Sequence, residues 1–416
     1  MMHFDRYFFA GIIRFPCVFL LYATCGLARA GETTPSYFAV SPGALADVIA
    51  HFDVAAIDRE RILKLARAAL ELPPLSITEY PAKLSDGCRN DYYSNGDYWW
   101  PDPAKSDGLP YIQRDGQTNP QNFNLHRLAL RQLRDAVAAL GAAYKITGDD
   151  RYPGKAAELL RGFFLDAATR MNPHLKYAQA IPGVSPGRGV GIIDTLHLIE
   201  VPPAIDAMRK SPAFPASTLA GMQQWFLDYC AWMTTSHNGH DEAVAKNNHA
   251  VAFWLQVAVF SKFTGDAVRL TECRRQFKEV FVPNQMALNG SFPAELSRTK
   301  PYAYSIFQLD NMTTLCQVLS TPDENLWTFE LPDGRNIRKA VAYLQPFLAD
   351  KSKWPLKPDV MAWDGWPARQ SALLFAGLAL GEPSYLALWN KLPPDPANEE
   401  VRRNIAITQP VLWLYN

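Results

Sequence analysis

Neither sign of charge is in excess in this 416-residue chain, because 41 Lys and Arg balance 41 Asp and Glu. A nucleic acid or an anionic membrane would call for a basic surplus, so we expect neither as a partner. Linkers rich in Gly, Ser or Pro and low-complexity tracts are also missing. We therefore predict a single domain over residues 31–416, in which any anion is bound by a local cluster of side chains.

Metal-binding spacings are missing as well. The eight histidines form no HxH or HExxH pattern, and the six cysteines form no CxxC pair. We therefore expect no metal and no cofactor. Four cysteines lie outside the N-terminal segment, and they are compatible with one or two disulfides or with burial as small apolar side chains. They are Cys88, Cys230, Cys273 and Cys316.

The first thirty residues have the pattern of a secretory signal peptide. Arg6 and Arg14 precede a short apolar run, and Ala28-Arg29-Ala30 has the small-x-small form of a cleavage site. The run is too short to span a bilayer comfortably. We expect cleavage after Ala30 and a periplasmic or secreted protein, with an uncleaved anchor as the alternative.

Apolar residues recur at three- and four-residue spacing along most of the chain, and alternating strand patterns are almost missing. Short and long connections alternate between the helices, as in a ring of helical hairpins. We therefore predict an all-α fold, an incomplete (α/α)6–7 toroid with its long loops at one end. The predicted helices are 43–52, 58–72, 122–147, 155–166, 193–210, 216–235, 248–263, 267–282, 304–319, 334–348, 369–380 and 384–391.

Residues 78–121 lose the helical periodicity and contain a dense aromatic cluster. Long irregular loops are uncommon in compact domains and often functional, and aromatic rings stack well on the C–H faces of sugars. We therefore expect Tyr92, Tyr93, Trp99 and Trp100 to contact a sugar. The alternative is that these rings pin the loop to the core.

Two polar clusters stand where apolar helices begin, namely Lys246-Asn247-Asn248-His249 and the segment from Glu295 to Ser305. The start of a helix has unpaired N–H groups and the positive end of the helix dipole, which suits an anionic ligand. We therefore expect a site for a sugar carboxylate that contains Asn248, His249, Arg298 and Tyr304.

These residue types suit β-elimination on a uronic acid that is linked through O4. The reaction removes the C5 proton, which is very weakly acidic while the neighbouring carboxylate is charged. Hydrogen-bond donors that neutralise the carboxylate are therefore the main requirement, and an amide, an imidazole and a guanidinium supply them. Tyr304 can take the proton from C5 and return it to O4 on the same face. Because a free tyrosine has a pKa of ~10, we expect cationic neighbours to favour its phenolate.

Purely structural roles and two further functions are also compatible with these residues. Asn247 has the residue type of a helix N-cap, Arg298 could pair with Glu295, and Tyr304 could be a core residue. A glycoside hydrolase on a similar toroid would need two carboxylates. A non-catalytic carbohydrate-binding protein would use the aromatic loop alone. The candidate acids for a hydrolase are Asp194, Asp241, Glu242 and Glu295.

These segments resemble the alginate lyase superfamily of helical-toroid polysaccharide lyases. The resemblance implies that Asn248, His249 and Arg298 neutralise the carboxylate and that Tyr304 is base and acid. The spacing from His249 to Tyr304 is closest to the branch acting on β-1,4-mannuronan and glucuronan. Further substrate contacts are expected at His174, Tyr177, Gln179, Arg188 and Tyr302. The segments that carry the resemblance are Asn247-Asn248-His249 with Gln256, Glu295-Leu296-Ser297-Arg298-Thr299 with Tyr304-Ser305, Met171-Asn172-Pro173, Tyr177-Ala178-Gln179, Pro182-Gly183, Gly187-Arg188 and Gly191-Ile192-Ile193-Asp194.

The chain departs from the family pattern at Ala250, Val251 and Ala252, and at Ala303, where the family often has His. These departures concern substrate choice and leave the four core residues in place. β-D-Mannuronate and β-D-glucuronate differ only at C2, so one tyrosine on one face serves both. α-L-Guluronate is inverted at C5 and would need a base and an acid on opposite faces, with His249 and Tyr304 as candidates. We therefore predict a preference for mannuronan or glucuronan.

Overall fold

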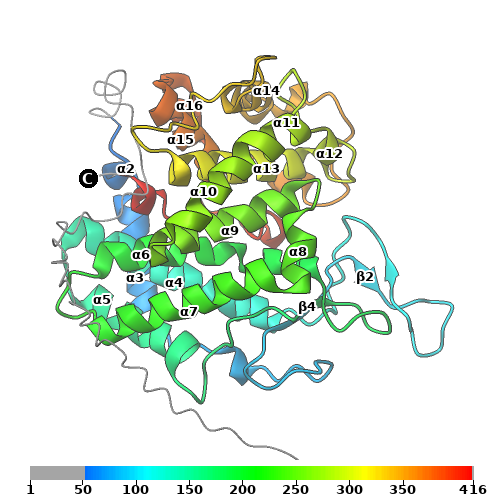
Figure 1. Ribbon diagram of the computed structural model, residues 1–416, viewed down its shortest axis with the longest axis vertical. Helices are drawn as coiled ribbons and strands as arrows, with labels where there is room; N and C mark the ends of the chain where they lie inside the picture. Colours follow the sequence, from blue (N-terminus) through cyan, green and yellow to red (C-terminus); the bar gives the residue numbers. More distant parts are fainter. Residues whose placement is uncertain (1–51, 415–416) are drawn as a thin grey trace, which may run out of the picture. The chain divides into compact units, whose positions relative to one another are not determined.

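The computed structural model describes residues 52–414, and helices packed side by side make up most of this part of the chain (Figure 1). The prediction of an all-α fold is confirmed. The α-helices are α2 Val54–Ile57, α3 Arg59–Leu70, α4 Leu125–Thr147, α5 Arg151–Leu160, α6 Val201–Met208, α7 Ala216–Thr235, α8 His237–Ala243, α9 Asn248–Thr264, α10 Ala267–Gln276, α11 Val282–Gln285, α12 Pro293–Leu296, α13 Pro301–Leu319, α14 Ile337–Ala349, α15 Ser371–Leu380, α16 Pro383–Lys391 and α17 Glu399–Arg402.

Shorter elements complete the fold. The 3-10 segments are η1 Ile77–Glu79, η3 Gly189–Glu200, η5 Lys351–Lys353, η6 Trp363–Gly365 and η7 Pro410–Trp413, and the π turns are η2 Arg161–Leu165 and η4 Phe277–Phe281. The strands are β1 Tyr93–Asn95, β2 Trp99–Trp100, β3 Ile112–Gln113 and β4 Tyr177–Ala180. β1 pairs with β4 in parallel, and β2 pairs with β3 in antiparallel. The β2–β3 hairpin projects from the end of the helices where α8 and β4 also lie (Figure 1).

Most predicted helices are found close to their expected bounds, and the differences have local causes. The predicted helix 193–210 is instead a long 3-10 segment, η3, followed by α6, which begins at Val201-Pro202-Pro203. Prolines lack the N–H groups that an α-helix continuing through them would need, so α6 starts anew there. The short helix α8 was not predicted. The predicted signal peptide 1–30, its cleavage after Ala30 and nearly all of helix 43–52 lie outside the described residues.

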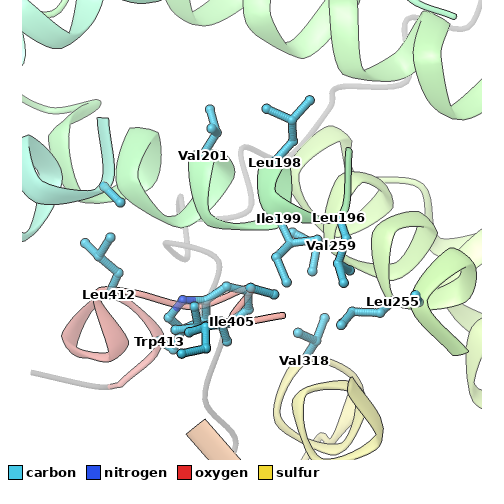
Figure 2. Packing of buried hydrophobic residues seen from close by; sticks show 14 of the residues in the cluster. Leu196, Leu198, Ile199, Val201, Leu255, Val259, Val318, Ile405, Leu412 and Trp413 are labelled. Carbon is cyan, nitrogen blue, oxygen red and sulfur yellow. The ribbon is translucent and has the colours of Figure 1, made fainter. Parts of the chain in front are cut away.

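The core is centred on two helices that carry no polar face. Every residue of α13 is buried, and most of α9 is buried as well. A helix that is covered on all sides has no amphipathic stripe. α9 and α13 pack directly against each other. Figure 2 shows η3, α9, α13 and the chain's C-terminal segment meeting in one apolar cluster that includes Leu196, Leu255, Val318 and Trp413. This packing holds the starts of α9 and α13 in a fixed relation.

The four described cysteines are free, and three of them are buried. The three buried ones, Cys230, Cys273 and Cys316, therefore act as small apolar side chains, one of the two alternatives that the sequence left open, whereas Cys88 is exposed. Among residues 52–414, no helix is both long and apolar enough to cross a membrane.

Two helical glycines offer a test of this packing. A Cβ on Gly141 of α4 would lie 2.9 Å from Ala204 Cα of α6, whereas a Cβ on Gly154 of α5 would come no closer than 3.9 Å to Ala213. We expect Gly141→Ala to lower the free energy of unfolding by about 1–3 kcal/mol through overpacking. Gly154→Ala should raise it by about 0.5–1 kcal/mol, because alanine favours the helix. Denaturant unfolding of both variants measures the two changes, and equal effects would contradict the described contact of α4 with α6.

Candidate active site

A polar cavity of ≈ 200 Å³ lies where α9 and α13 begin. Seven of the residues that the sequence predicted for the site line it together. They come from the β2–β3 hairpin, the β4 region and the two helix starts, which are far apart in the chain. They are Trp99, Gln179, Arg188, Asn248, His249, Arg298 and Tyr304.

Asn248 stands in the first turn of α9, directly after the N-cap residue Asn247, whose side chain accepts a hydrogen bond from His249 N–H. The Asn248 backbone N–H and its Nδ2 donate to the two oxygens of Glu295, at 2.7 and 2.6 Å. An amide nitrogen carries two hydrogens, so one of them remains for a ligand in the cavity. Burial raises the pKa of Glu295, although the bonds from Asn248 oppose this rise.

His249 is held through its Nδ1, which lies 2.6 Å from Glu242 Oε1 of α8. Its Nε2 has no bonded partner among the described residues, and the ring lines the cavity. Burial alone would lower the pKa of His249, but the adjacent Glu242 and the more distant Glu295 raise it above its usual value. The imidazole can therefore present a charged N–H group to an anion.

Arg298 folds back onto Tyr304, which stands six positions further along the chain. Its guanidinium lies 4.4 Å above the Tyr304 ring, and one of its nitrogens donates to the Tyr304 hydroxyl at 3.2 Å. The acid that pairs with Arg298 is Asp115, at 2.8 Å, and not Glu295. Thr299 Oγ1 also donates to Asp115, at 2.9 Å. The segment after β3 thus positions the guanidinium.

The protonation state of Tyr304 differs from the expectation. Burial, with Tyr98 beside it, raises the pKa of Tyr304 well above its usual value, and Arg298 only opposes this rise. The expected stabilisation of the phenolate by cations is outweighed by burial. Tyr304 is therefore a phenol at neutral pH.

Tyr98 is a site residue that the sequence reasoning missed. Its hydroxyl lies 2.8 Å from the Tyr304 hydroxyl and accepts hydrogen bonds from Lys300 and Arg403, each at 3.0 Å. Lys300 also forms a buried ion pair with Glu400. Tyr98 belongs to the predicted aromatic cluster, but no pattern distinguishes it there from the four rings that were expected to contact the sugar. Arg403 comes from the chain's end and carried no recognisable pattern.

The C-terminal segment, residues 394–413, is tied to the helices through its backbone. Arg134 donates to Ala406 O at 2.6 Å, Lys145 donates to Val411 O at 2.9 Å, and Gln317 donates to Trp413 O at 3.1 Å. These bonds fix the path that brings Arg403 and Asn404 into the cavity wall.

Arg188 differs from the other arginines that line the cavity. Arg127 and Arg403 pair with Asp97, and Arg298 pairs with Asp115. Arg188 donates only to Gln179, to the backbone oxygen at 2.9 Å and to the side-chain oxygen at 3.3 Å, and among the described residues it has no acidic partner. Gln179 itself has a positive φ of 48°, a strained conformation that is often found at functional sites. Of the guanidinium groups that line the cavity in the described part of the chain, that of Arg188 is thus the one without a carboxylate partner.

Six predicted contact residues lie outside the cavity. Tyr92, Tyr93 and Tyr302 are buried, and their hydroxyls bond to Asp194, Asn95 and Phe347 O, respectively. These three rings pack in the core and do not line the cavity, and a sugar contact by them stays a prediction. The remaining three are partly exposed beside the cavity, and their roles stay predictions. They are Trp100, His174 and Tyr177.

The candidate acids for a glycoside hydrolase are unsuited to that reaction. Asp241 pairs with His237 on the surface, and Asp194 is bonded to Arg127. Glu242 and Glu295 stand behind the donors that they position. Arginine neighbours outweigh burial and hold the pKa of Asp97 and of Asp115 below the usual value. Within residues 52–414, the carboxyls that line the cavity are Asp97, Asp115 and Asp194, and each of them pairs with an arginine.

Binding of a metal ion by the described part of the chain would require a cluster of suitable side chains. Among residues 52–414, no group of three or more His, Cys, Asp or Glu side chains is placed to hold a metal ion.

Similarity to known proteins extends over most of the chain. The family model described as alginate lyase matches residues 77–354. The crystal structure of an alginate lyase from Bacteroides ovatus has 34% identity and a TM-score of 0.76, over 90% of this chain and 100% of that chain. Alginate lyase A1-III from Sphingomonas species A1 has 16% identity and a TM-score of 0.52, over 83% of this chain and 87% of that chain. A search of curated proteins finds no match. The predicted toroid of helical hairpins is confirmed by these structures.

Proposed function

Because this chain belongs to the alginate lyase family, we propose that it cleaves β-1,4-linked polyuronates, mannuronan or glucuronan, by β-elimination. The observation that carries the proposal is the contact of Arg298 with the Tyr304 hydroxyl, at 3.2 Å, in a cavity that Asn248 and His249 also line. Three donors for a carboxylate and one phenol for a proton thus meet at one place.

In this mechanism the sugar carboxylate is bound by Asn248 Nδ2, His249 Nε2 and the Arg298 guanidinium. Their positive hydrogens stabilise the charge that develops on the carboxylate when C5 loses its proton. Glu295, Glu242 and Asp115 hold these donors in place before the sugar arrives. Preorganised donors of this kind are usually the largest single contribution to catalysis.

Tyr304 is the proposed base and acid. Its phenolate would accept a hydrogen bond from Arg298, and a second one from Tyr98. Tyr98 is free to donate its hydrogen because Lys300 and Arg403 occupy the lone pairs of its oxygen. After C5 gives up its proton, Tyr304 returns that proton to O4, and a double bond forms between C4 and C5.

The test is to incubate the purified protein with polymannuronate, glucuronan and polyguluronate and to follow the ultraviolet absorbance of the conjugated double bond. We expect this product from mannuronan or glucuronan. Activity on polyguluronate alone would contradict the single-face mechanism. A new reducing end without the double bond would instead indicate hydrolysis.

Arg188 is the proposed receptor for the carboxylate of a neighbouring sugar. Its guanidinium is unpaired and stands 5.7 Å from the Trp99 ring centroid. A charge-assisted hydrogen bond contributes about 1.5–3 kcal/mol, so we expect Arg188→Gln to raise KM for oligouronates roughly 10- to 100-fold. kcat should change little, since the contact is equal in ground and transition states. Initial rates over a range of oligomer concentrations measure both constants.

Arg114→Gln is the matched control, because Arg114 stacks on Trp100 at 4.9 Å, outside the cavity. Its KM should stay within about twofold of the wild-type value, as is usual for surface substitutions. A loss in kcat alone for Arg188→Gln would contradict the binding role.

We also propose that the protein is exported with removal of residues 1–30. The motivating pattern is the apolar run from Phe15 to Leu21, which is followed by the cleavage-site pattern Ala28-Arg29-Ala30. Sequencing the N-terminus of the protein recovered from the periplasm or the medium tests this, and recovery of Met1 there would contradict it.

A further inference from the structure

The contact between Glu242 and His249 bears on which C5 epimer of a uronic acid the site can process. Glu242 is 2% exposed and lies in α8, the short helix just before α9. Its Oε1 is 2.6 Å from His249 Nδ1. Because Nδ1 is bonded in this way, Nε2 is the ring nitrogen left for a ligand in the cavity, which Tyr304 also lines.

The other charged groups around this ring are few. Glu295 of α12 and Arg298 are the further charged side chains that act on His249. Asp194 of η3 and Tyr304 of α13 line the same cavity from elements that pack against α9. Glu295 accepts a hydrogen bond from Asn248, and Arg298 forms an ion pair with Asp115. Among the acids of residues 52–414, Glu242 is therefore the one in direct contact with the imidazole.

We propose that Glu242 biases the enzyme toward the C5 configuration of mannuronate and glucuronate, by favouring the form in which one proton sits on His249 and not on Tyr304. This inference rests on the lyase reaction proposed above. It makes Glu242 a positioning residue that acts through His249 and touches no substrate atom.

Elimination from the two C5 epimers requires different protonation states of His249 and Tyr304. For mannuronate or glucuronate, the Tyr304 phenolate removes the C5 proton and passes it to O4, while protonated His249 donates to the carboxylate. For guluronate, whose C5–H points to the opposite face, neutral His249 Nε2 takes the C5 proton and the Tyr304 hydroxyl protonates O4. In both routes the C5–H and C4–O bonds break, and a C4=C5 bond and an O4–H bond form. The second route leaves His249 protonated and Tyr304 as phenolate.

The two starting forms contain the same number of protons. One has imidazolium and phenolate, and the other has imidazole and phenol. Bulk pH therefore populates them in a constant ratio, and only the difference between the two pKa values changes that ratio. Glu242 raises the pKa of His249 and so shifts the ratio toward imidazolium and phenolate. Substrate choice is thus set by a buried carboxylate and is independent of pH.

The test compares kcat/KM for polymannuronate and polyguluronate in the wild-type enzyme and in Glu242→Gln. An adjacent opposite charge typically shifts a pKa by roughly one to three units, so we expect the His249 pKa to fall by at least about one unit. The ratio of mannuronate to guluronate activity should fall by the same factor, roughly tenfold per unit. Nuclear magnetic resonance of labelled histidine, assigned with His249→Gln, gives the pKa without reference to activity.

Two controls separate this effect from a structural one. Asp241→Asn removes an exposed acid of α8 that pairs with His237, and it should leave both the ratio and the His249 pKa unchanged. Glu242→Asp keeps the charge and should retain the wild-type preference even where both rates fall. In the wild-type enzyme, the ratio should stay constant between about pH 6 and 9, a range that includes the usual pKa of histidine.

An unchanged ratio in Glu242→Gln, despite a lower His249 pKa, would overturn the proposal. So would a wild-type ratio that changes with pH. Where the wild-type activity on polyguluronate is undetectable, its appearance in Glu242→Gln is the supporting result, and its continued absence is the contrary one. A wild-type enzyme that makes no unsaturated product from any polyuronate would instead refute the proposed function.

Discussion

Replacing Tyr304 by phenylalanine is expected to reduce kcat/KM on mannuronan or glucuronan by at least about 10³-fold. Proton transfer by one positioned group contributes roughly 10²- to 10⁴-fold, and Tyr304 is proposed to act twice in each turnover. The substitution removes one hydroxyl and leaves the ring under Arg298, at 4.4 Å. Binding of oligouronates should therefore persist. Product absorbance measures the loss, and calorimetric titration measures the retained affinity.

Tyr302→Phe is the matched control for this experiment. Tyr302 stands two positions earlier in the same helix, but its hydroxyl donates to Phe347 O at 2.9 Å, away from the cavity. We expect near-normal activity and a loss of stability of about 1 kcal/mol, the usual contribution of one hydrogen bond. Near-normal activity in Tyr304→Phe would show that another group is the base.

The second large effect is expected for Asn248→Asp, with a fall in kcat/KM of roughly 10³-fold. Loss of one preorganised donor costs about 10²- to 10³-fold. In addition, the new carboxylate would face Glu295 at the position where Nδ2 now lies 2.6 Å away. The double variant with Glu295→Gln should recover stability, because the amide then donates to the carboxylate. It should not recover activity, because the donor toward the sugar is still missing.

Asn247→Asp is the control that tests whether the loss of activity expected for Asn248→Asp is specific to position 248. Asn247 caps α9 through its Oδ1, and aspartate is an equally good cap at a helix start. We expect the stability to be retained and activity to stay within a few-fold. Thermal unfolding and product absorbance are measured on all these variants. Equal losses for Asn247→Asp and Asn248→Asp would contradict the assigned roles.

The parts of this protein that the sequence predicted well are those governed by local chemistry. Asn247 is a cap residue before an apolar run, and the start of α9 was placed correctly at Asn248. Arg298 reaches Tyr304 across six residues, a separation that a single turn can close. Such relations depend on neighbours in the chain, and helix periodicity and capping describe neighbours well.

The parts that were missed depend on distant contacts. Tyr98 could not be separated from Tyr92 and Tyr93 because the loop around them has no period that says which side faces inward. The pairs Glu242–His249 and Glu295–Asn248 join the short helices α8 and α12, respectively, to α9. No local sequence pattern predicts the angles at which these helices approach α9. The raised pKa of Tyr304 follows from burial, which a list of neighbouring charges does not reveal.

Arg403 and Glu400 could not be predicted as site residues either, because their role also depends on contacts that are distant in the sequence. They lie outside residues 77–354, the part matched by the family model. Arg403 nevertheless donates to Tyr98, which lines the cavity. Glu400 pairs with Lys300, which also donates to the Tyr98 hydroxyl. A residue that arrives from a separate part of the chain leaves no signature near the motif that it serves.

The backbone ties of residues 394–413 have an implication for biosynthesis. Ribosomes and export channels release a chain from its amino end, so the donors on α9 and the phenol on α13 emerge well before Arg403. Until the last stretch docks against Arg134 and Lys145, the wall of the cavity is incomplete. A nascent or carboxy-terminally clipped molecule would therefore hold the reacting groups without the full enclosure, and turnover would begin only once the tail is seated.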